Sequence, residues 1–377
     1  MKIVALTTSS VHVNRRGDWL FVRLQTDEGL QGQGEASHGS GAGGDGRVRR
    51  LLEEHCRPLL LGRDPRSVVA GIAALQPLAQ GRPGATAVSA CEQALWDLAG
   101  KALGTPVHRL FGGPVRTRIP LYANINRATA ERTPAAFAAN AAAAAAEGFR
   151  AVKCAPFDGL PRERLYQPDG QEFLRRGLAC VAAVRQAIGP ELTLLVDCHS
   201  RFDLATARSV ARELLALGVT WLEEPVPTDD LPALRQVAAS LGEPELAGVE
   251  LIGGESLYGL AGFWPYLREG LWRVVMPDVK HCGGIAAALA IAQAASAGGA
   301  ALSPHNPSGP VATAASAQLA AVVPQVRHLE YAWGEVPWRA DLVQPPERIE
   351  HGELLLPEGP GLGVALNEAA VAAQRSA

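Results

Sequence analysis

The sequence predicts an α/β fold in which parallel strands alternate with helices, preceded by a smaller α+β unit. From residue 116 onward, eight short apolar segments alternate with seven helical ones. This alternation is typical of a closed parallel barrel or of an open doubly wound sheet. Eight strands over about 220 residues favour the barrel. No eighth helix follows the last strand, so we predict a modified TIM barrel, (β/α)7β.

Residues 1–115 are predicted to form the α+β unit, which would cap the barrel. A β-meander is expected over residues 1–36, where short apolar runs are separated by turn residues. The Gly-rich segment Gly39–Gly46 is either an active-site flap or a plain linker. Apolar spacing of three and four residues predicts helices over 46–61, 66–78 and 84–103.

Residues 116–345 are predicted to form the barrel, whose active site would lie at the C-terminal ends of its strands. The predicted strands are Ile119–Ile125, Ala151–Ala155, Leu192–Asp197, Val219–Glu223, Glu250–Gly254, Arg273–Met276, Ala300–Ser303 and His328–Tyr331. The predicted helices cover 134–147, 171–188, 204–217, 230–241, 260–269, 284–297 and 310–322.

Residues 346–377 are predicted to return to the N-terminal unit. After a Pro-rich crossing, 353–357 and 362–366 have the pattern of short strands. We therefore expect the C-terminal segment to complete the α+β capping domain.

Composition argues against several classes of protein. The net charge is −3, so nothing indicates a nucleic acid or an acidic membrane surface as a partner. The apolar stretch 135–146 is too short to span a bilayer, and no signal-peptide pattern precedes the first strand. The six cysteines form no Cys-x-x-Cys pair, which predicts reduced thiols and a cytoplasmic protein.

Three consecutive predicted strands end in an acidic residue: Asp197, Glu223 and Glu255. Since parallel strands one strand–helix unit apart point the same way, these carboxylates are expected to meet at one end of the sheet. Three carboxylates at that distance repel one another and need a cation. An all-oxygen ligand set favours Mg²⁺, or Mn²⁺, over Zn²⁺.

Other reactive residues also stand at predicted strand ends. Asp278 ends the sixth strand and His305 the seventh, so the two are expected to meet as a dyad in which the carboxylate raises the pKa of the imidazole. Lys153 ends the second strand and would either donate to an oxyanion or form a salt bridge with the acids. His199 follows Asp197 by two residues and would face the same side in an extended chain.

These groups suggest one type of reaction. A metal and a lysine would stabilise negative charge on an oxygen, and a His–Asp base would remove a proton. That combination describes abstraction of the proton α to a carboxylate, through an enediolate.

Motifs spread over nearly the whole chain resemble the enolase superfamily and, within it, the mandelate racemase subgroup. They are Gln93–Lys101 with Gly112-Gly113, Glu223-Glu224-Pro225, Gly254-Glu255, Pro277-Asp278 before Gly283-Gly284, and Gly359–Gly363. The resemblance implies three metal ligands, which match Asp197, Glu223 and Glu255. It also implies that His305 and Asp278 form the base dyad and that Glu330 hydrogen-bonds the substrate carboxylate.

Two features divide this family. Its racemases carry Lys-x-Lys on the second barrel strand, whereas this chain has Lys153-Cys154-Ala155, and Ala155 cannot move a proton. Asp197 and His199, together with Pro304–Pro307 and Gly309-Pro310, resemble galactonate dehydratase and related acid-sugar dehydratases. In those enzymes the histidine is the general acid that protonates the departing hydroxyl.

The resemblance therefore implies a lyase, a Mg²⁺-dependent dehydratase that converts a sugar acid into a 2-keto-3-deoxy acid. One alternative is an epimerase, racemase or cycloisomerase of a hydroxy acid or lactone, with His199 as a second acid–base group. Another is a non-catalytic relative that keeps the fold and the metal for ligand sensing. A small carboxylate is the expected partner, and the family implies a homo-oligomer.

Substrate selection is expected to depend on the flap and on loops at the strand ends. The segment 157–173 is longer than a strand–helix connection needs and is a candidate for shaping the pocket. Possible substrate contacts are Arg15, Arg16, His38, Asn124, Arg201 and Trp333.

Overall fold

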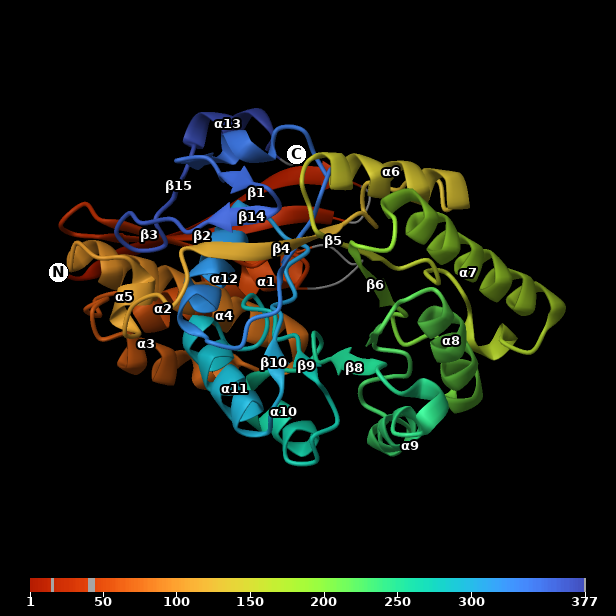
Figure 1. Ribbon diagram of the computed structural model, residues 1–377. Coiled ribbons are helices and arrows are strands. Elements are labelled where there is room, and N and C mark those ends of the chain that lie inside the picture. The colour runs from red at the N-terminus through yellow and green to blue at the C-terminus, as the bar shows by residue number, and fades with distance from the viewer. Residues whose placement is uncertain (15–16, 40–44, 376–377) are drawn as a thin grey trace.

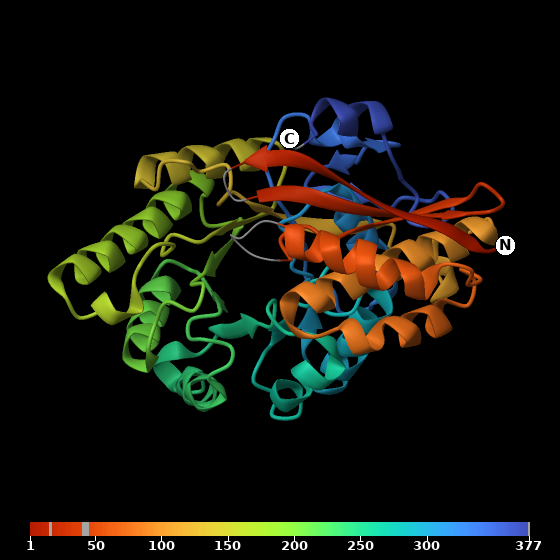
Figure 2. The ribbon, with the colours of Figure 1, turned by 180° about the vertical axis from the view of Figure 1, so that it is seen from behind.

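The computed structural model describes residues 1–14, 17–39 and 45–375. A three-stranded antiparallel sheet and its helices lie against a larger, mostly parallel sheet whose helices wind around its outer side (Figure 1). Seen from behind, the N-terminal strands cross the top of the molecule, and the C-terminal segment packs above them (Figure 2). The predicted alternation of strands and helices is confirmed.

The N-terminal unit begins with the expected meander, in which β1, β2 and β3 pair in that order. Its strands are β1 (Ile3–Asn14), β2 (Gly17–Thr26) and β3 (Gln31–Glu35). The first predicted helix is interrupted by a π-helical turn, giving α1 (Gly46–Arg50), η2 (Leu51–Cys56) and α2 (Arg57–Leu60). The remaining helices are α3 (Val68–Leu75), η3 (Gln76–Leu78), α4 (Gly81–Ala102) and α5 (Val107–Leu110).

Strand β3 carries glycine because it lies directly against α4. A Cβ on Gly32 would come within 2.2 Å of the Ala94 carbonyl oxygen, and one on Gly34 within 2.1 Å of the Ala90 carbonyl oxygen. A larger residue at either position would push the helix away from the sheet. The two glycines therefore set the position of α4, whose first turn reaches the cavity described below.

The parallel strands follow one another in the sheet in chain order, from β4 to β10, and β11 pairs in parallel with β4. They are β4 (Arg118–Asn124), β5 (Ala151–Cys154), β6 (Thr193–Asp197), β7 (Trp221–Glu223), β8 (Glu250–Gly253), β9 (Val274–Val275), β10 (Ala301–Leu302) and β11 (Leu329–Tyr331). The ladders of β9 and β10 are shorter than the sequence predicts. Between β10 and the chain before β11 there is one isolated parallel bridge, from Leu302 to Val326.

The connecting segments cover the outer side of the parallel sheet. The helices are α6 (Pro134–Ala146), α7 (Pro168–Ile188), α8 (Leu204–Ala216), α9 (Leu231–Leu241), α10 (Gly259–Leu267), α11 (Ile285–Ala297) and α12 (Pro310–Val322). Short 3-10 turns are η4 (Arg162–Arg164) and η5 (Pro244–Leu246). Asp203 and Asp230 cap α8 and α9, because each side chain accepts a hydrogen bond from the first helical turn.

The C-terminal segment contacts both parts of the molecule. Its elements are η6 (Arg339–Leu342), β12 (Val343–Gln344), β13 (Ile349–Glu350), β14 (Glu353–Leu355), β15 (Ala365–Leu366) and α13 (Glu368–Ala373). Strand β14 pairs antiparallel with β4, while the side chain of Gln33 bonds the backbone of Val364 and Leu366. Helix α13 was not predicted, although Asn367 at its start is a typical N-cap residue.

Buried acids of the N-terminal unit bind the backbone of the other part. Glu92 accepts hydrogen bonds from the amides of Ile285 and Ala286 at the start of α11, both at 2.8 Å. Glu35 accepts from the amides of Gly309 and Ala312 at the start of α12, at 2.7 and 2.9 Å. Carboxylates at helix N-termini satisfy amides that have no partner within the helix. These contacts hold the N-terminal unit over the strand ends.

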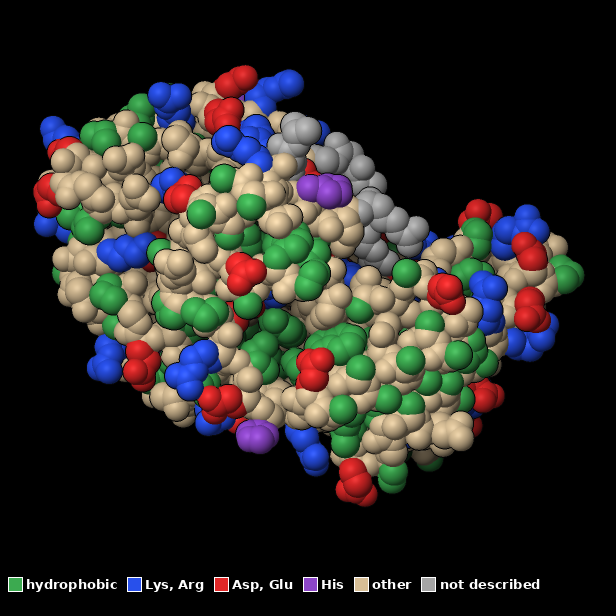
Figure 3. Space-filling model, turned by 90° about the horizontal axis from the view of Figure 1, so that it is seen from above, with side chains coloured by type: hydrophobic (Ala, Val, Ile, Leu, Met, Phe, Trp, Pro, Cys, Tyr) green, Lys and Arg blue, Asp and Glu red, His purple; other side chains and the backbone are tan. Residues whose placement is uncertain are grey.

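Within the described residues, no helix has both the length and the apolar character that crossing a membrane requires. All six cysteines are free thiols, as predicted, and all six are buried. The face shown in Figure 3 carries acidic and basic side chains interspersed, rather than one patch of a single sign. The cytoplasmic location and the homo-oligomer stay predictions.

Candidate active site

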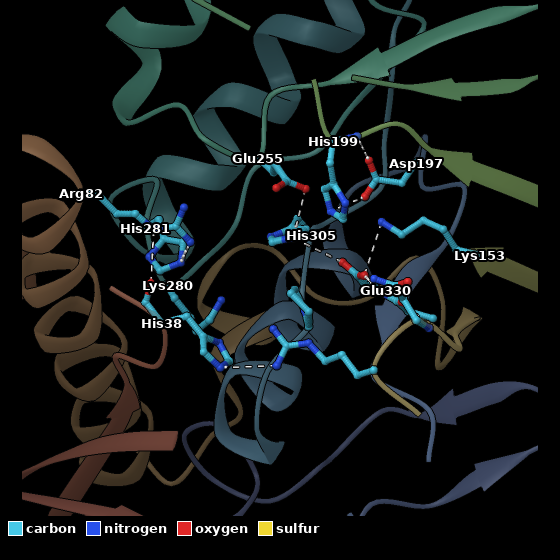
Figure 4. A pocket seen from close by; sticks show the side chains of 14 residues that line it. His38, Arg82, Lys153, Asp197, His199, Glu255, Lys280, His281, His305 and Glu330 are labelled. Carbon is cyan, nitrogen blue, oxygen red and sulfur yellow. Dashed lines mark hydrogen bonds and ion pairs between the residues drawn. The ribbon is translucent and has the colours of Figure 1, made fainter. Parts of the chain in front are cut away.

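A cavity of about 160 Å³ lies at the C-terminal ends of the parallel strands, where the sequence predicts the active site. It brings together most of the predicted site residues: Lys153, Asp197, His199, Glu255, His305 and Glu330 (Figure 4). Asp278 lies directly behind His305, and Glu223 lies behind Lys153. The predicted convergence of strand-end residues is therefore found.

The three predicted metal ligands form one cluster. Oxygen atoms of Asp197, Glu223 and Glu255 lie within 4.8 Å of one another. Asp197 and Glu223 are opposite each other in the β6–β7 ladder, as expected. Glu255 is not in that row, because Ile252 is the residue opposite Glu223 and β8 ends at Gly253. The prediction that Glu255 ends its strand, as the other two acids do, was therefore wrong.

A turn after β8 brings Glu255 back to the cluster. Gly254 has a φ of 107°, a conformation that favours glycine. Glu224 holds this turn, since its Oε1 accepts hydrogen bonds from the Gly254 amide at 3.3 Å and from Thr228 Oγ1 at 2.9 Å. The second glutamate of the Glu-Glu-Pro motif thus positions a candidate ligand.

The cluster carries excess negative charge. Burial, followed by the neighbouring carboxylates, raises the pKa of Glu223 to about 8, although Lys153 acts in the opposite direction. Glu255 Oε2 is buried and makes no hydrogen bond within the described residues, although His305 Nε2 lies 3.1 Å away as an ion-pair partner. A buried carboxylate oxygen that makes no hydrogen bond, close to two other carboxylates, fits a bound cation.

Lys153 links this cluster to Glu330. Its Nζ lies 2.7 Å from Glu223 Oε1 and 3.3 Å from Glu330 Oε1. Burial alone would lower the pKa of Lys153, but the two carboxylates raise it well above its usual range. The pKa of Glu330 falls to about 2 because Lys153 and His305 outweigh the effect of burial. Lys153 is therefore charged and Glu330 is ionised.

His305 and Asp278 form the predicted dyad. His305 Nδ1 lies 2.8 Å from Asp278 Oδ2, and Nε2 lies 3.1 Å from Glu255 Oε2. Burial acts to lower the pKa of His305, yet Glu255, Glu330 and Asp278 raise it. The side chain of Lys280 also donates to Asp278 Oδ2, at 2.5 Å. Asp278 thus fixes the ring so that Nε2 is directed away from it, toward the acids.

His199 faces the same cavity, but for a different reason than predicted. Its φ is 44°, and that of Ser200 is 59°, so the chain turns here instead of continuing extended. The ring still lies over the first acid, with Nε2 at 2.8 Å from Asp197 Oδ2. The expectation of an extended Asp-x-His segment was wrong, although the side chain reaches the predicted place.

Asp158 is a site residue that the sequence did not identify. Its Oδ1 contacts His199 Nδ1, while its Oδ2 lies 3.0 Å from Asn126 Nδ2 and 3.3 Å from Arg132 Nη2. Burial would raise the pKa of Asp158, but His199 lowers it below its usual range. The sequence feature that could have pointed to Asp158 is the unusually long segment 157–173. This segment places the Asp158 carboxylate against His199.

The predicted specificity residues divide into three groups. His38 and Asn124 line the cavity. Arg201 and Trp333 do not belong to its lining among the described residues, and Trp333 Nε1 donates to Glu147 at 2.7 Å instead. Arg15, Arg16 and residues 40–44 of the predicted flap lie outside the described residues. The lining also includes residues that were not predicted: Arg82, Asn126, Arg127, Lys280 and His281.

Comparison with protein families identifies two matching parts. Residues 3–112 match the N-terminal domain of the mandelate racemase / muconate lactonizing enzyme family, and residues 136–370 match the enolase C-terminal domain-like family. Together these matches span most of the chain.

Several relatives have similar sequences. D-gluconate dehydratase of Thermoproteus tenax is 34% identical over 82% of this chain, which spans 61% of that protein. D-galactonate dehydratase of Verminephrobacter eiseniae is 33% identical over 98% of this chain and 94% of its own length. D-galactarolactone cycloisomerase of Agrobacterium fabrum is 30% identical over 97% of this chain and 93% of its own length.

Solved structures agree with the family match. A putative dehydratase from Mesorhizobium loti superposes with a TM-score of 0.89 at 27% identity, covering 100% of this chain and 99% of its own. A putative mandelate racemase/muconate lactonizing enzyme from Burkholderia superposes with a TM-score of 0.86 at 31% identity. The match covers 100% of this chain and 94% of that one.

Proposed function

The chain belongs to the mandelate racemase / muconate lactonizing enzyme family of the enolase superfamily, and from this membership we propose that it is a Mg²⁺-dependent dehydratase of a sugar acid. One observation carries the proposal. Two histidines, each held by an aspartate, line one cavity with Lys153 and with two members of the three-acid cluster. An elimination needs a base and an acid, and this cavity supplies both.

The acid cluster fits a hard divalent cation. Asp197, Glu223 and Glu255 offer only oxygen atoms, and these atoms lie within 4.8 Å of one another. We propose that these residues hold Mg²⁺, with Mn²⁺ as a substitute. When bound, the ion would supply positive charge that stabilises the carboxylate of the substrate as the α-proton leaves.

The protein's own residues would carry the proton transfers. His305 Nε2 takes the C2 proton, while Asp278 holds Nδ1 and stabilises the imidazolium. Lys153 donates to the developing negative charge on the carboxylate oxygens, and Glu330 binds the same end of the substrate. The electron pair from the broken C–H bond forms the C1–C2 double bond of the enediolate.

His199 completes the elimination. It gives a proton to the C3 hydroxyl, which leaves as water when the C3–O bond breaks and the C2–C3 double bond forms. The enol product then tautomerises to a 2-keto-3-deoxy acid. The net change is the loss of one water molecule, so neither an oxidant nor a reductant is needed.

The second candidate is an epimerase or cycloisomerase. It is favoured by the relative named D-galactarolactone cycloisomerase, which is 30% identical. In that case His199 would return a proton to C2 from the other side, or protonate a ring oxygen. A third candidate, a ligand-binding relative without activity, is disfavoured because the base, the acid and the candidate ligands are all present.

The proposal is tested by incubating the Mg²⁺-loaded protein with a library of five- and six-carbon acid sugars and assaying for 2-keto acids. We expect at least one member to lose water. If none does, the same library is repeated in D₂O. Deuterium at C2 without loss of water would replace the dehydratase assignment by the epimerase one.

Asp158→Ala is expected to slow water loss by about 10- to 100-fold, because His199 then lacks the partner that orients its ring. Exchange of the C2 hydrogen with D₂O should stay within about threefold of wild type, since that step depends on His305. Asp169→Ala, an exposed acid nearby on α7, is the matched control. An equal fall in exchange and water loss would contradict this role.

We also propose that the eight parallel strands close into a (β/α)7β barrel over residues 116–345, with 1–115 and 346–377 forming the capping domain. One buried cluster takes a side chain from each of five neighbouring strands, β4 to β8: Tyr122, Ala151, Leu195, Trp221 and Ile252. Leu302 makes two backbone hydrogen bonds with the chain before β11. Its amide donates to the Gln325 carbonyl oxygen at 2.7 Å, and its carbonyl oxygen accepts from the Arg327 amide at 2.9 Å. Inward-facing layers of this kind are typical of such barrels.

A further inference from the structure

The cavity has a second end that the proposed chemistry does not use. Basic side chains from four parts of the chain line it: His38, Arg82, Arg127, Lys280 and His281. In Figure 4, Arg82, Lys280 and His281 lie on the opposite side of His305 from Lys153 and Asp197. The acid cluster and the basic residues thus occupy opposite ends of one small space.

Of the three Arg and Lys side chains at this end, two are paired with a carboxylate of the protein. Arg127 Nη1 lies 2.6 Å from Glu335 Oε1, and Lys280 Nζ lies 2.5 Å from Asp278 Oδ2. Each pair is largely buried, so its charges are balanced before any ligand enters. Arg82 is the third, and no carboxylate of the described residues pairs with it.

Among the described residues, Arg82 is held by neutral groups. Its Nη2 lies 3.1 Å from His281 Nε2, and its Nε donates to the His38 carbonyl oxygen at 3.2 Å. A guanidinium has no acceptor atom, so His281 Nε2 must be unprotonated in this contact. The proton of His281 is then on Nδ1, which lies 2.8 Å from Thr86 Oγ1.

These contacts form a closed ring. Thr86 Oγ1 donates in turn to the carbonyl oxygen of Arg82, at 2.7 Å. Each of the three hydrogen bonds of this ring has one donor and one acceptor when His281 is neutral. Burial, with Lys280 and Arg82 nearby, also holds the pKa of His281 well below its usual range despite Asp278. Arg82 is therefore fixed in place, and no carboxylate of the described residues pairs with it.

We propose that Arg82 binds a second carboxylate, at the far end of the substrate, and that the substrates are sugar diacids rather than aldonic acids. This inference rests on the proposed function. A fixed guanidinium offers a planar pair of donors that matches a carboxylate, whereas a hydroxyl would leave the charge unbalanced. One unpaired positive charge also matches one carboxylate better than a phosphate, which carries nearly two negative charges.

The test compares kcat/KM for matched pairs, galactarate against galactonate and glucarate against gluconate. We expect wild type to prefer the diacid of at least one pair by about tenfold or more. Arg82→Gln should lower kcat/KM for that diacid by about 10- to 100-fold, the range expected for one charge-assisted hydrogen bond. The same change should leave the monoacid within about threefold, as one tenfold step corresponds to 1.4 kcal/mol.

Two further variants serve as controls. Arg82→Lys keeps the charge and should retain part of the preference, which separates binding from a folding defect. Arg50→Gln replaces an exposed arginine on α1 and should change nothing. Equal turnover of diacid and monoacid by wild type, or a preference that survives Arg82→Gln, would overturn the proposal.

A binding measurement separates this inference from the proposed reaction. Calorimetry on the Mg²⁺-loaded His305→Asn protein should give a lower Kd for galactarate than for galactonate, and Arg82→Gln should remove the difference. If no acid sugar loses water but this difference is found, the proposed reaction fails and the role of Arg82 stands. Tighter binding of 6-phosphogluconate than of galactarate would overturn the assignment to a carboxylate.

Discussion

Replacement of His305 by asparagine is expected to abolish both the loss of water and the exchange of the C2 hydrogen with solvent. His305 Nε2 lies beside Glu255 and Glu330, at the acidic end of the cavity where the substrate carboxylate would bind. Removing a general base of this kind costs about 10²- to 10⁴-fold. The measurement is kcat for 2-keto acid formation, followed by proton NMR of the recovered substrate from D₂O.

His199→Asn is the informative comparison, because the two histidines would act on different bonds. This variant should also lose water formation, but it should still exchange the C2 hydrogen, since His305 remains able to remove and return it. Asparagine keeps a hydrogen-bonding side chain of similar size in each case. If His199→Asn loses exchange and His305→Asn retains it, the roles are reversed and the assignment of base and acid is wrong.

Glu255→Gln is expected to have opposite effects on stability with and without the metal. In excess EDTA the variant should melt at a higher temperature than wild type, because one of three neighbouring negative charges is gone. With Mg²⁺ at about 100 times its Kd, wild type should gain about 2.7 kcal/mol, and the variant should gain much less. Activity should fall at least about a thousandfold, because the charge stabilisation that a bound metal supplies to the transition state is worth several kcal/mol.

The control for this experiment is Glu54→Gln, which removes an exposed carboxylate in the N-terminal unit. Its melting temperature should respond to Mg²⁺ as wild type does. Isothermal titration with Mn²⁺ gives a reading that does not depend on activity. Undiminished Mn²⁺ binding by Glu255→Gln would exclude Glu255 as a ligand.

Much of the site followed from positions along the chain. Lys153, Asp197 and Glu223 stand at the ends of strands that the apolar pattern identifies, and parallel strands place their ends together. The same reasoning located Asp278 and His305, although β9 and β10 are only two residues long. Strand-end residues are predictable because hydrophobic periodicity and chain direction are both local properties.

Two predicted positions were wrong at points where the chain leaves the strand. Glu255 reaches the acid cluster through a turn at Gly254, and His199 reaches the cavity in a left-handed conformation. Both predictions assumed that the backbone stays extended beyond the strand. The two side chains reach the predicted place, but through turns and not through extended chain. The hydrogen bonds of Glu224 that hold the Gly254 turn depend on the neighbouring strand.

The sequence by itself determined the order of strands and helices, the acids at the strand ends and the His–Asp dyad, since each depends on spacing within one or two neighbouring units. Only the tertiary structure decided which residues complete the cavity. Asp158 meets His199 because a long segment folds back behind it, and Arg82 reaches the far end because β3 and α4 pack closely at Gly32 and Gly34. Contacts between distant segments depend on how whole elements pack, and no local pattern in the chain specifies that packing.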